Sequence, residues 1–129
     1  MSSIFTKIIN GEIPAHKVAE DDNFLAFLDI SPLQKGHTLV VPKKETDYIF
    51  DIADDELSAM VLFAKAVAQK ISKVFPCNRV GMTVIGLEVP HAHIHLIPIN
   101  AEPDMNFHSP KLNLSAEELS SIAQQLREA

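Results

Sequence analysis

The chain has 129 residues, 47% of them hydrophobic, and a formal net charge of -6. This length and composition fit one domain, residues 1–129, with an ordinary apolar core that needs neither disulfides nor a structural metal. The eleven Lys and Arg residues are scattered along the chain, so we do not expect the long basic surface that binds a nucleic-acid polymer. A local positive site for a small anionic ligand remains compatible with this charge.

The single cysteine, Cys77, cannot form an internal disulfide, and the residues after Met1 do not resemble a charged and then apolar leader. No apolar run approaches the roughly 20 residues that a membrane-spanning helix requires. We therefore expect a cytoplasmic protein without a membrane partner.

The first half of the chain predicts strands and then one long helix. Two short apolar runs bounded by turn residues, 24–29 and 38–42, are typical of strands. From Asp54 to Val74, apolar residues recur every three or four positions, with acidic residues at the start. Pro76 follows this segment and cannot continue a helix, so the pattern predicts one amphipathic helix that ends before it.

The second half predicts strands, a loop and a shorter helix. Residues 79–85 are typical of a strand, and residues 100–113 are rich in Pro, Asn, Asp and Ser, which indicates a long loop. A capping-box sequence at Ser115 begins a short C-terminal helix. This order of elements favours an antiparallel α+β fold over a wound βαβ sheet. Neither GxGxxG nor GxxxxGK is present, so a phosphate site needs other residues.

Residues 89–98 alternate in character along a predicted strand. Because side chains alternate across a strand, three histidines share one face, while the opposite face is apolar and can pack on the long helix. A strand that only happens to carry three solvated or buried histidines is a weak explanation, because three of the six histidines in the chain alternate here. The residues predicted on the histidine face are Val89, His91, His93, His95 and Ile97.

Metal binding is one explanation for this face. Same-face positions are about 6.6 Å apart along a strand, so His91 and His95 stand roughly 13 Å apart at the backbone and cannot readily converge on one ion. A complete zinc site then needs a ligand from elsewhere, such as His37, His108 or Glu88. The chain has no CxxC or HExxH motif to supply one.

Phosphoryl chemistry suits a row of imidazoles better. The central His93 can attack phosphorus as a neutral nucleophile and form a covalent intermediate that water resolves. His91 and His95 can orient it, donate hydrogen bonds to phosphate oxygens or protonate a leaving group. This chemistry requires no metal and no other cofactor.

Residues 91–97 resemble the signature of the histidine triad (HIT) superfamily, in which three histidines alternate with hydrophobic residues. Three more blocks, residues 3–14, 27–32 and 36–43, resemble its Hint-like branch, so the resemblance covers nearly the whole chain. It implies a HIT-like antiparallel sheet of about five strands, one long central helix and a short C-terminal helix. It also implies a homodimer whose two sheets join into one.

The resemblance further implies a nucleotide hydrolase or transferase. Such an enzyme cleaves a phosphorus-nitrogen or phosphoanhydride bond at the α-phosphate of a nucleoside 5'-phosphate derivative, such as a phosphoramidate or a dinucleoside polyphosphate. The family's nucleophile corresponds to His93, and its fourth histidine, which supports the triad, corresponds to His37. The pocket for base and ribose, suited to a purine nucleotide, maps to Phe5, Ile8, Phe27, Leu28, Asp29 and Ile30.

These pocket residues also have structural explanations. Asp29 offers a carboxylate to two ribose hydroxyls, but an Asp before Ser31-Pro32 also suits a turn cap. Phe5 and Phe27 offer apolar faces to a base, or they are core aromatics.

One segment departs from the family. Where relatives commonly carry Gln-Ser in contact with the α-phosphate, this chain has Leu87-Glu88. A carboxylate at Glu88 repels a phosphate if it points inward, and otherwise faces solvent or a cationic leaving group. The physiological substrate therefore stays open. Two other hypotheses are a nucleotide-binding regulatory module with little turnover and a zinc-binding protein.

Overall fold

The computed structural model describes residues 2–129. Three α-helices, five strands and two short 3-10 helices, η1 and η2, follow one another along these residues. In chain order they are α1 (Ile4–Ile9), β1 (Lys17–Glu20), β2 (Phe24–Leu28), β3 (Thr38–Pro42), η1 (Ile49–Asp51), α2 (Asp54–Val74), β4 (Arg79–Thr83), β5 (Ile94–Ile99), η2 (Glu102–Met105) and α3 (Ala116–Glu128).

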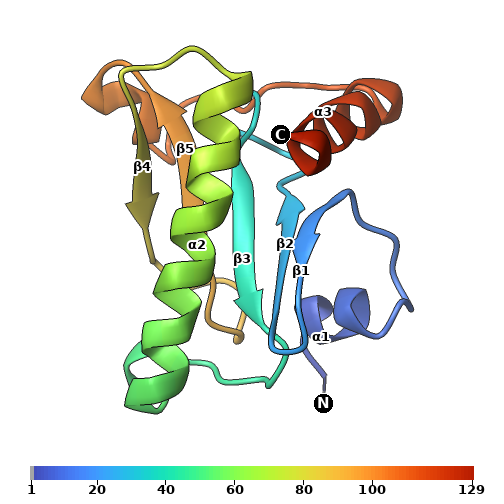
Figure 1. Ribbon diagram of the computed structural model, residues 1–129, viewed down its shortest axis with the longest axis vertical. Helices are drawn as coiled ribbons and strands as arrows, with labels where there is room; N and C mark the ends of the chain where they lie inside the picture. Colours follow the sequence, from blue (N-terminus) through green and yellow to red (C-terminus); the bar gives the residue numbers. More distant parts are fainter. Residues whose placement is uncertain (1) are drawn as a thin grey trace.

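The strands form one antiparallel sheet in the order β1-β2-β3-β5-β4. Helix α2 runs along one face of this sheet, and α3 packs beside β1 and β2 (Figure 1). The sheet, the long helix and the C-terminal helix confirm the predicted α+β class. Among residues 2–129, no helix combines the length and the apolarity that crossing a membrane requires.

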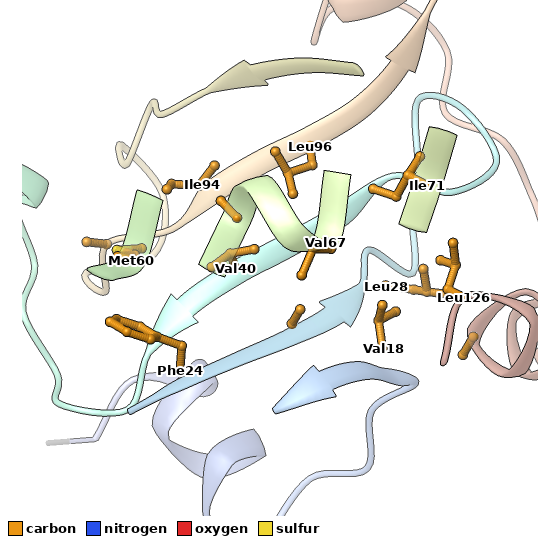
Figure 2. Packing of buried hydrophobic residues seen from close by; sticks show 14 of the residues in the cluster. Val18, Phe24, Leu28, Val40, Met60, Val67, Ile71, Ile94, Leu96 and Leu126 are labelled. Atoms are coloured by element: carbon orange, nitrogen blue, oxygen red, sulfur yellow. The ribbon is translucent and has the colours of Figure 1, made fainter. Parts of the chain in front are cut away.

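The main core lies between α2 and the sheet. Met60, Ala64, Val67 and Ile71 form the buried stripe of α2, at the three- and four-residue spacing that the sequence shows. They pack against alternate residues of the strands and against α3, as Figure 2 shows for Val40 and others. Burying one such aliphatic side chain contributes about 1.5–3 kcal/mol, so this stripe secures α2 to the sheet.

The predicted long helix is confirmed at both ends. Asp54, Asp55 and Glu56 stand in its first turn, where their charges favour the positive end of the helix dipole. Phe75 has extended backbone angles at the C-terminal end. This conformation is expected for a residue that precedes a proline, here Pro76.

One α-helix and one strand were not predicted from the sequence, α1 and β1, and neither were the two short 3-10 helices. Helix α1 has six residues, too few for a clear helical repeat, and it buries Phe5 and Ile8 against the sheet. Ser3 caps its N-terminus by accepting a hydrogen bond from the N–H of Thr6. Strand β1 has four residues, of which only Val18 is buried, so its hydrophobic alternation is too short to stand out.

The predicted strand over residues 89–98 is wrong in its first half, because β5 begins only at Ile94. Continuing the register between β3 and β5 would place Pro42 opposite Ala92, and proline has no N–H to donate to the ladder. Ala92 instead donates its N–H to the carbonyl of Thr46 at 2.7 Å. Strand β4 likewise ends at Thr83, two residues earlier than predicted.

Candidate active site

The histidines lie on the sheet face opposite α2. Leu39 and His95 stand directly opposite each other on β3 and β5, and Leu39 belongs to the apolar cluster that α1 covers. The side chains of Ala92, Ile94 and Leu96 belong to the cluster under α2. The predicted division into a histidine face and a helix face is therefore confirmed over this segment. The histidines are nevertheless buried, because α1 and the segment after η2 cover them.

His93 has one ring nitrogen bound to the protein and one that is free of such a bond. Its Nδ1 lies 2.8 Å from the backbone carbonyl of His91. A carbonyl only accepts hydrogen bonds, so Nδ1 carries the ring proton and Nε2 carries the lone pair. The rings of Phe5 and His95 hold the imidazole edge-on, with centroids 5.0 and 4.9 Å away. This arrangement leaves His93 with a nucleophilic Nε2.

His37 and His95 form a hydrogen-bonded relay that places the proton of His95 on the ring nitrogen opposite to the one protonated in His93. The backbone N–H of Leu33 donates to His37 Nδ1 at 3.1 Å, so the proton of His37 is on Nε2. That Nε2 lies 3.0 Å from His95 Nδ1 and donates to it. The remaining proton of His95 is therefore on Nε2, and His95 offers an N–H where His93 offers a lone pair.

Burial keeps this relay uncharged. Loss of hydration is the main cause that lowers the pKa of His37 to about 3, and the nearby His95 and Lys111 contribute in the same direction. Burial and then His93 lower the pKa of His95 to about 4. At neutral pH both rings are neutral, which the relay requires because each ring must accept one hydrogen bond.

His91 is bound at both ring nitrogens. Its Nε2 donates to the carbonyl of Pro42 at 2.8 Å, and its Nδ1 lies 2.7 Å from the hydroxyl of Ser3. The ring is fully buried, and burial lowers its pKa. His91 thus has no N–H left to donate to a phosphate oxygen or to a leaving group. Of the roles predicted for it from the sequence, only that of orienting His93 agrees with these hydrogen bonds.

Asp29 follows β2 and lies beside the relay. Its Oδ1 accepts the N–H of Ser31 at 2.8 Å, which is the turn cap that the sequence also allowed. Its Oδ2 lies 3.7 Å from His37 Nε2, beyond hydrogen-bond distance. Burial is the main cause that raises the pKa of this carboxyl. One oxygen therefore shapes the turn and the other remains available to a ligand.

The other predicted pocket residues separate into two groups. Phe5, Ile8 and Phe27 share the buried cluster on the histidine face. Leu28 instead belongs to the core under α2, and Ile30 is 71% exposed. The structure therefore brings three of these five apolar side chains together beside the histidines.

The segment Leu87-Glu88, which departs from the family pattern described for the sequence, lies on the surface. Glu88 is exposed, and Leu87 beside it is 88% exposed. Gly86 has a φ of +71°, a left-handed conformation that suits glycine in such a turn. Of the two alternatives for Glu88, solvent exposure is the one that this arrangement favours.

Comparison with known proteins decides the family. The model of the HIT domain family matches residues 10–102. The chain belongs to the HIT family. An adenosine 5'-monophosphoramidase of Schizosaccharomyces pombe, hnt1, is 33% identical over 128 residues, which cover 98% of this chain and 96% of that protein.

Solved structures agree with this membership. A HIT-like protein from Bartonella henselae, involved in cell-cycle regulation, is 30% identical with a TM-score of 0.85, covering 98% of this chain and 95% of that one. A zinc-bound histidine triad family protein from Mycobacterium smegmatis is 26% identical with a TM-score of 0.81, covering 99% and 92%. The HIT family includes nucleotide-binding hydrolases.

Besides Ser3, two residues of this HIT protein from the C-terminal half reach the site without having been predicted. The ring of Phe107 lies 4.8 Å from that of His95 and 6.1 Å from that of His37. Lys111 Nζ lies 5.9 Å from the centre of the Phe107 ring, and its charge acts on both Asp29 and His37. Both lie in the predicted long loop, where one aromatic residue among polar ones was the available signal. His108, which the sequence left open, is exposed.

Three side chains of the HIT site could hold a metal ion. One donor atom each of Asp29, His37 and His95 lies within 4.8 Å of the others. This cluster includes one histidine of the triad, His95, and tertiary structure brings the other two possible ligands from outside the triad. An ion bound there would compete with the relay, because His37 Nε2 and His95 Nδ1 would both have to face the metal as lone pairs.

Proposed function

We propose that this protein cleaves the α-phosphate bond of a nucleoside 5'-phosphate derivative, a phosphoramidate or a dinucleoside polyphosphate, through a nucleotidyl intermediate on His93. The observation that carries the proposal is the pair of opposite tautomers, with a lone pair on His93 and an N–H on His95. A nucleophile and a hydrogen-bond donor beside each other suit attack at phosphorus and stabilisation of the departing group.

In the first step His93 Nε2 attacks the α-phosphorus, and the bond from phosphorus to the leaving group breaks. The departing nitrogen or oxygen takes a proton from solvent and accepts a hydrogen bond from His95 Nε2–H, while the His91 carbonyl stabilises the positive charge that develops on His93. In the second step water attacks phosphorus, the bond from phosphorus to His93 breaks, and the proton of the water passes to solvent. Both histidines end the cycle in their starting state.

The proposed substrate pocket follows from the neighbours of these rings. Phe5, Ile8 and Phe27 offer apolar surface to a base, and the free oxygen of Asp29 can accept hydrogen bonds from ribose hydroxyls. The relationship to hnt1, which is named an adenosine 5'-monophosphoramidase, supports an adenosine phosphoramidate as the first substrate to test.

The test compares wild type with His93→Ala on adenosine 5'-phosphoramidate. We expect the variant to lose at least about a thousandfold in kcat, since a covalent nucleophile is removed. Rapid quenching of the wild type should yield an acid-labile adenylyl group on His93. Equal rates for the two proteins would defeat the nucleophile. A panel that adds dinucleoside polyphosphates and a nucleotidyl sulfate then ranks the leaving groups.

Two alternatives are resolved by the same protein preparations. A regulatory nucleotide-binding module would bind AMP in calorimetry but show no turnover that His93→Ala removes. Zinc binding is favoured by the cluster of Asp29, His37 and His95. If chelator-washed protein needs stoichiometric zinc for activity, the metal-free mechanism is wrong, whereas inhibition by zinc that chelator reverses agrees with competition against the relay.

We also propose that a second copy of the chain covers β4. This strand ends the sheet, so one of its edges has unpaired backbone groups (Figure 1). Beside it, Met82, Val84 and Ile85 are exposed, as are Val61 and Leu62 of α2. These residues include part of the lining of an apolar groove between β4, η1 and α2. If two β4 strands pair antiparallel about a two-fold axis, the unpaired backbone groups of both copies form the same hydrogen bonds.

The dimer is tested by mass in solution. Val84→Glu should convert a dimer of about twice the chain mass into a monomer in light scattering, because it places a charge in the apolar groove. Ser121→Glu on the exposed side of α3 is the matched control and should leave the mass unchanged. A wild type that is monomeric at micromolar concentration contradicts the proposal.

A further inference from the structure

A hydrogen-bond network joins the N-terminus of α1 to His91. The Ser3 hydroxyl accepts the N–H of Thr6 at 3.0 Å and lies 2.7 Å from His91 Nδ1, to which it donates. Ser3 is 6% exposed, and His91 is fully buried. The residue that caps a short helix is thus also the hydrogen-bond partner of a histidine 88 positions further along the chain.

Glu45, which follows β3, fixes the position of Ser3. Its Oε1 accepts the backbone N–H of Ser3 and the hydroxyl of Thr6, each at 2.7 Å. The Ser3 N–H is the main cause that lowers the pKa of this carboxyl to about 2. Glu45 therefore remains ionised throughout the physiological range, and its charge strengthens both hydrogen bonds.

The other side of His91 leads to the proposed nucleophile. Its Nε2 donates to the carbonyl of Pro42, and its own backbone carbonyl accepts Nδ1–H of His93. The latter bond is what leaves the lone pair of His93 on Nε2. A single chain of hydrogen bonds therefore runs from Glu45 through Ser3 and His91 to His93, and it connects three separate parts of the sequence.

We propose that Ser3, held by Glu45, is a positioning residue for His93: it locks the ring and backbone of His91, whose carbonyl then selects the reactive tautomer of His93. This inference rests on the proposed function. The Thr6 hydroxyl lies 3.4 Å from His91 Nδ1 but donates its proton to Glu45 at 2.7 Å. Without the Ser3 hydroxyl, the buried Nδ1 therefore loses its close donor, and the ring is free to rotate or to move its proton. The His91 carbonyl then loses its fixed direction toward His93.

A simpler role for Ser3 is that of a helix cap alone, and α3 supplies the control for it. Ser115 caps α3 in the same way, accepting the N–H of Glu118 at 3.1 Å, and its exposed side chain has no part in the hydrogen-bond chain to His93. Ser3→Ala and Ser115→Ala both remove a cap hydroxyl. Only the first removes the partner of His91.

The experiment measures kcat and KM on adenosine 5'-phosphoramidate. We expect Ser3→Ala to lower kcat about tenfold or more with KM changed less than twofold, because the geometry of the attacking ring is lost while the pocket remains. Ser3→Thr, which keeps the hydroxyl, should recover most of the rate. Ser115→Ala should lower the melting temperature and leave kcat unchanged. A kcat for Ser3→Ala equal to that of Ser115→Ala overturns the inference.

A second measurement separates this inference from the proposed function. The ¹⁵N chemical shifts of the histidine side chains report which ring nitrogen carries the proton, whether or not a substrate turns over. We expect His93 in the wild type to be protonated on Nδ1 alone, and in Ser3→Ala to show a mixture of the two tautomers. An unchanged Nδ1–H form in Ser3→Ala overturns the inference even if the wild type is an active hydrolase. A shifted tautomer in a protein without turnover upholds it while the proposed function fails.

Discussion

His93 and His95 have the same side chain and stand two positions apart, but neighbouring groups place their protons on opposite nitrogens. The His91 carbonyl accepts a hydrogen bond from His93 Nδ1–H, and the relay that begins at the Leu33 N–H donates a hydrogen bond to His95 Nδ1. Backbone groups at both ends do not titrate, so the pattern depends only on the rings remaining neutral. The chemistry of the site is thus decided by hydrogen-bond partners as much as by residue type.

The positive charge of Lys111 is expected to contribute to binding of a nucleotide substrate. This side chain is a positively charged group beside the relay, and its charge acts on both His37 and Asp29. We expect Lys111→Met to raise KM for a nucleotide substrate about two- to fivefold with little change in kcat, because a screened attraction to phosphate is lost. Steady-state kinetics at low and high salt check this, and the difference should shrink at high salt.

The control for this experiment is Lys73→Met on the exposed side of α2, which removes the same charge away from the histidine face. If both variants change KM equally, the effect belongs to the net charge of the protein and not to the position of Lys111.

At the scale of the elements, the turn before β3 places His37. Gly36 has a φ of +95°, which side-chain-bearing residues rarely adopt, and a Cβ there would lie 2.8 Å from the ring of Phe75. The turn at Gly36 therefore packs closely against Phe75, the residue that follows α2. The position of the relay is set by packing of this turn on the long helix and by the start of β3.

Gly36→Ala should therefore lower the free energy of unfolding by about 2–4 kcal/mol, since backbone strain and a steric clash add. Gly11→Ala is the matched control, with a φ of +79° but no heavy atom within 4 Å of the added Cβ. It should cost only about 1 kcal/mol. Urea denaturation of both variants measures the difference, and equal costs would show that the contact with Phe75 is unimportant.

Over the whole molecule, the buried histidines link stability to pH. His37 and His95 titrate with an ordinary pKa of 6.5 in the unfolded chain but at about 3 and about 4 in the folded protein. Between pH 6.5 and 5 the unfolded chain therefore binds more protons than the folded one. The stabilisation is complete above pH 6.5 and decreases as the pH falls toward the folded values.

We expect the free energy of unfolding to fall with decreasing pH in this window, by up to about 1.4 kcal/mol per pH unit for each of the two rings. Denaturation at fixed protein concentration across pH 7 to 5 measures the slope. His37→Gln removes one of the two titrating rings, so it should reduce the slope by the contribution of that ring. A free energy that is constant from pH 7 to 5 would contradict the burial of neutral rings.

The fold class could be predicted because its main elements have local signals. The helix over Asp54–Val74 shows its periodicity and its stop at Pro76, and β3 shows an apolar run ended by Pro42. The short α1 lacked such a signal because its stability comes from burying Phe5 and Ile8 on a sheet formed by distant residues. The start of β5 was predicted too early, since the block at Pro42 acts from the neighbouring strand.

Some features of the candidate site could likewise be predicted from the sequence, and others depend on tertiary structure. The sequence alone specifies that His91, His93 and His95 alternate, and that this alternation belongs to the HIT family, because both are properties of neighbouring residues. Only tertiary structure brings Ser3 to His91 and Phe107 to His95. It also decides which ring nitrogens carry protons, because the groups that bind them come from parts of the chain up to 88 positions away. Hydrogen bonds of that sequence separation leave no local pattern to read.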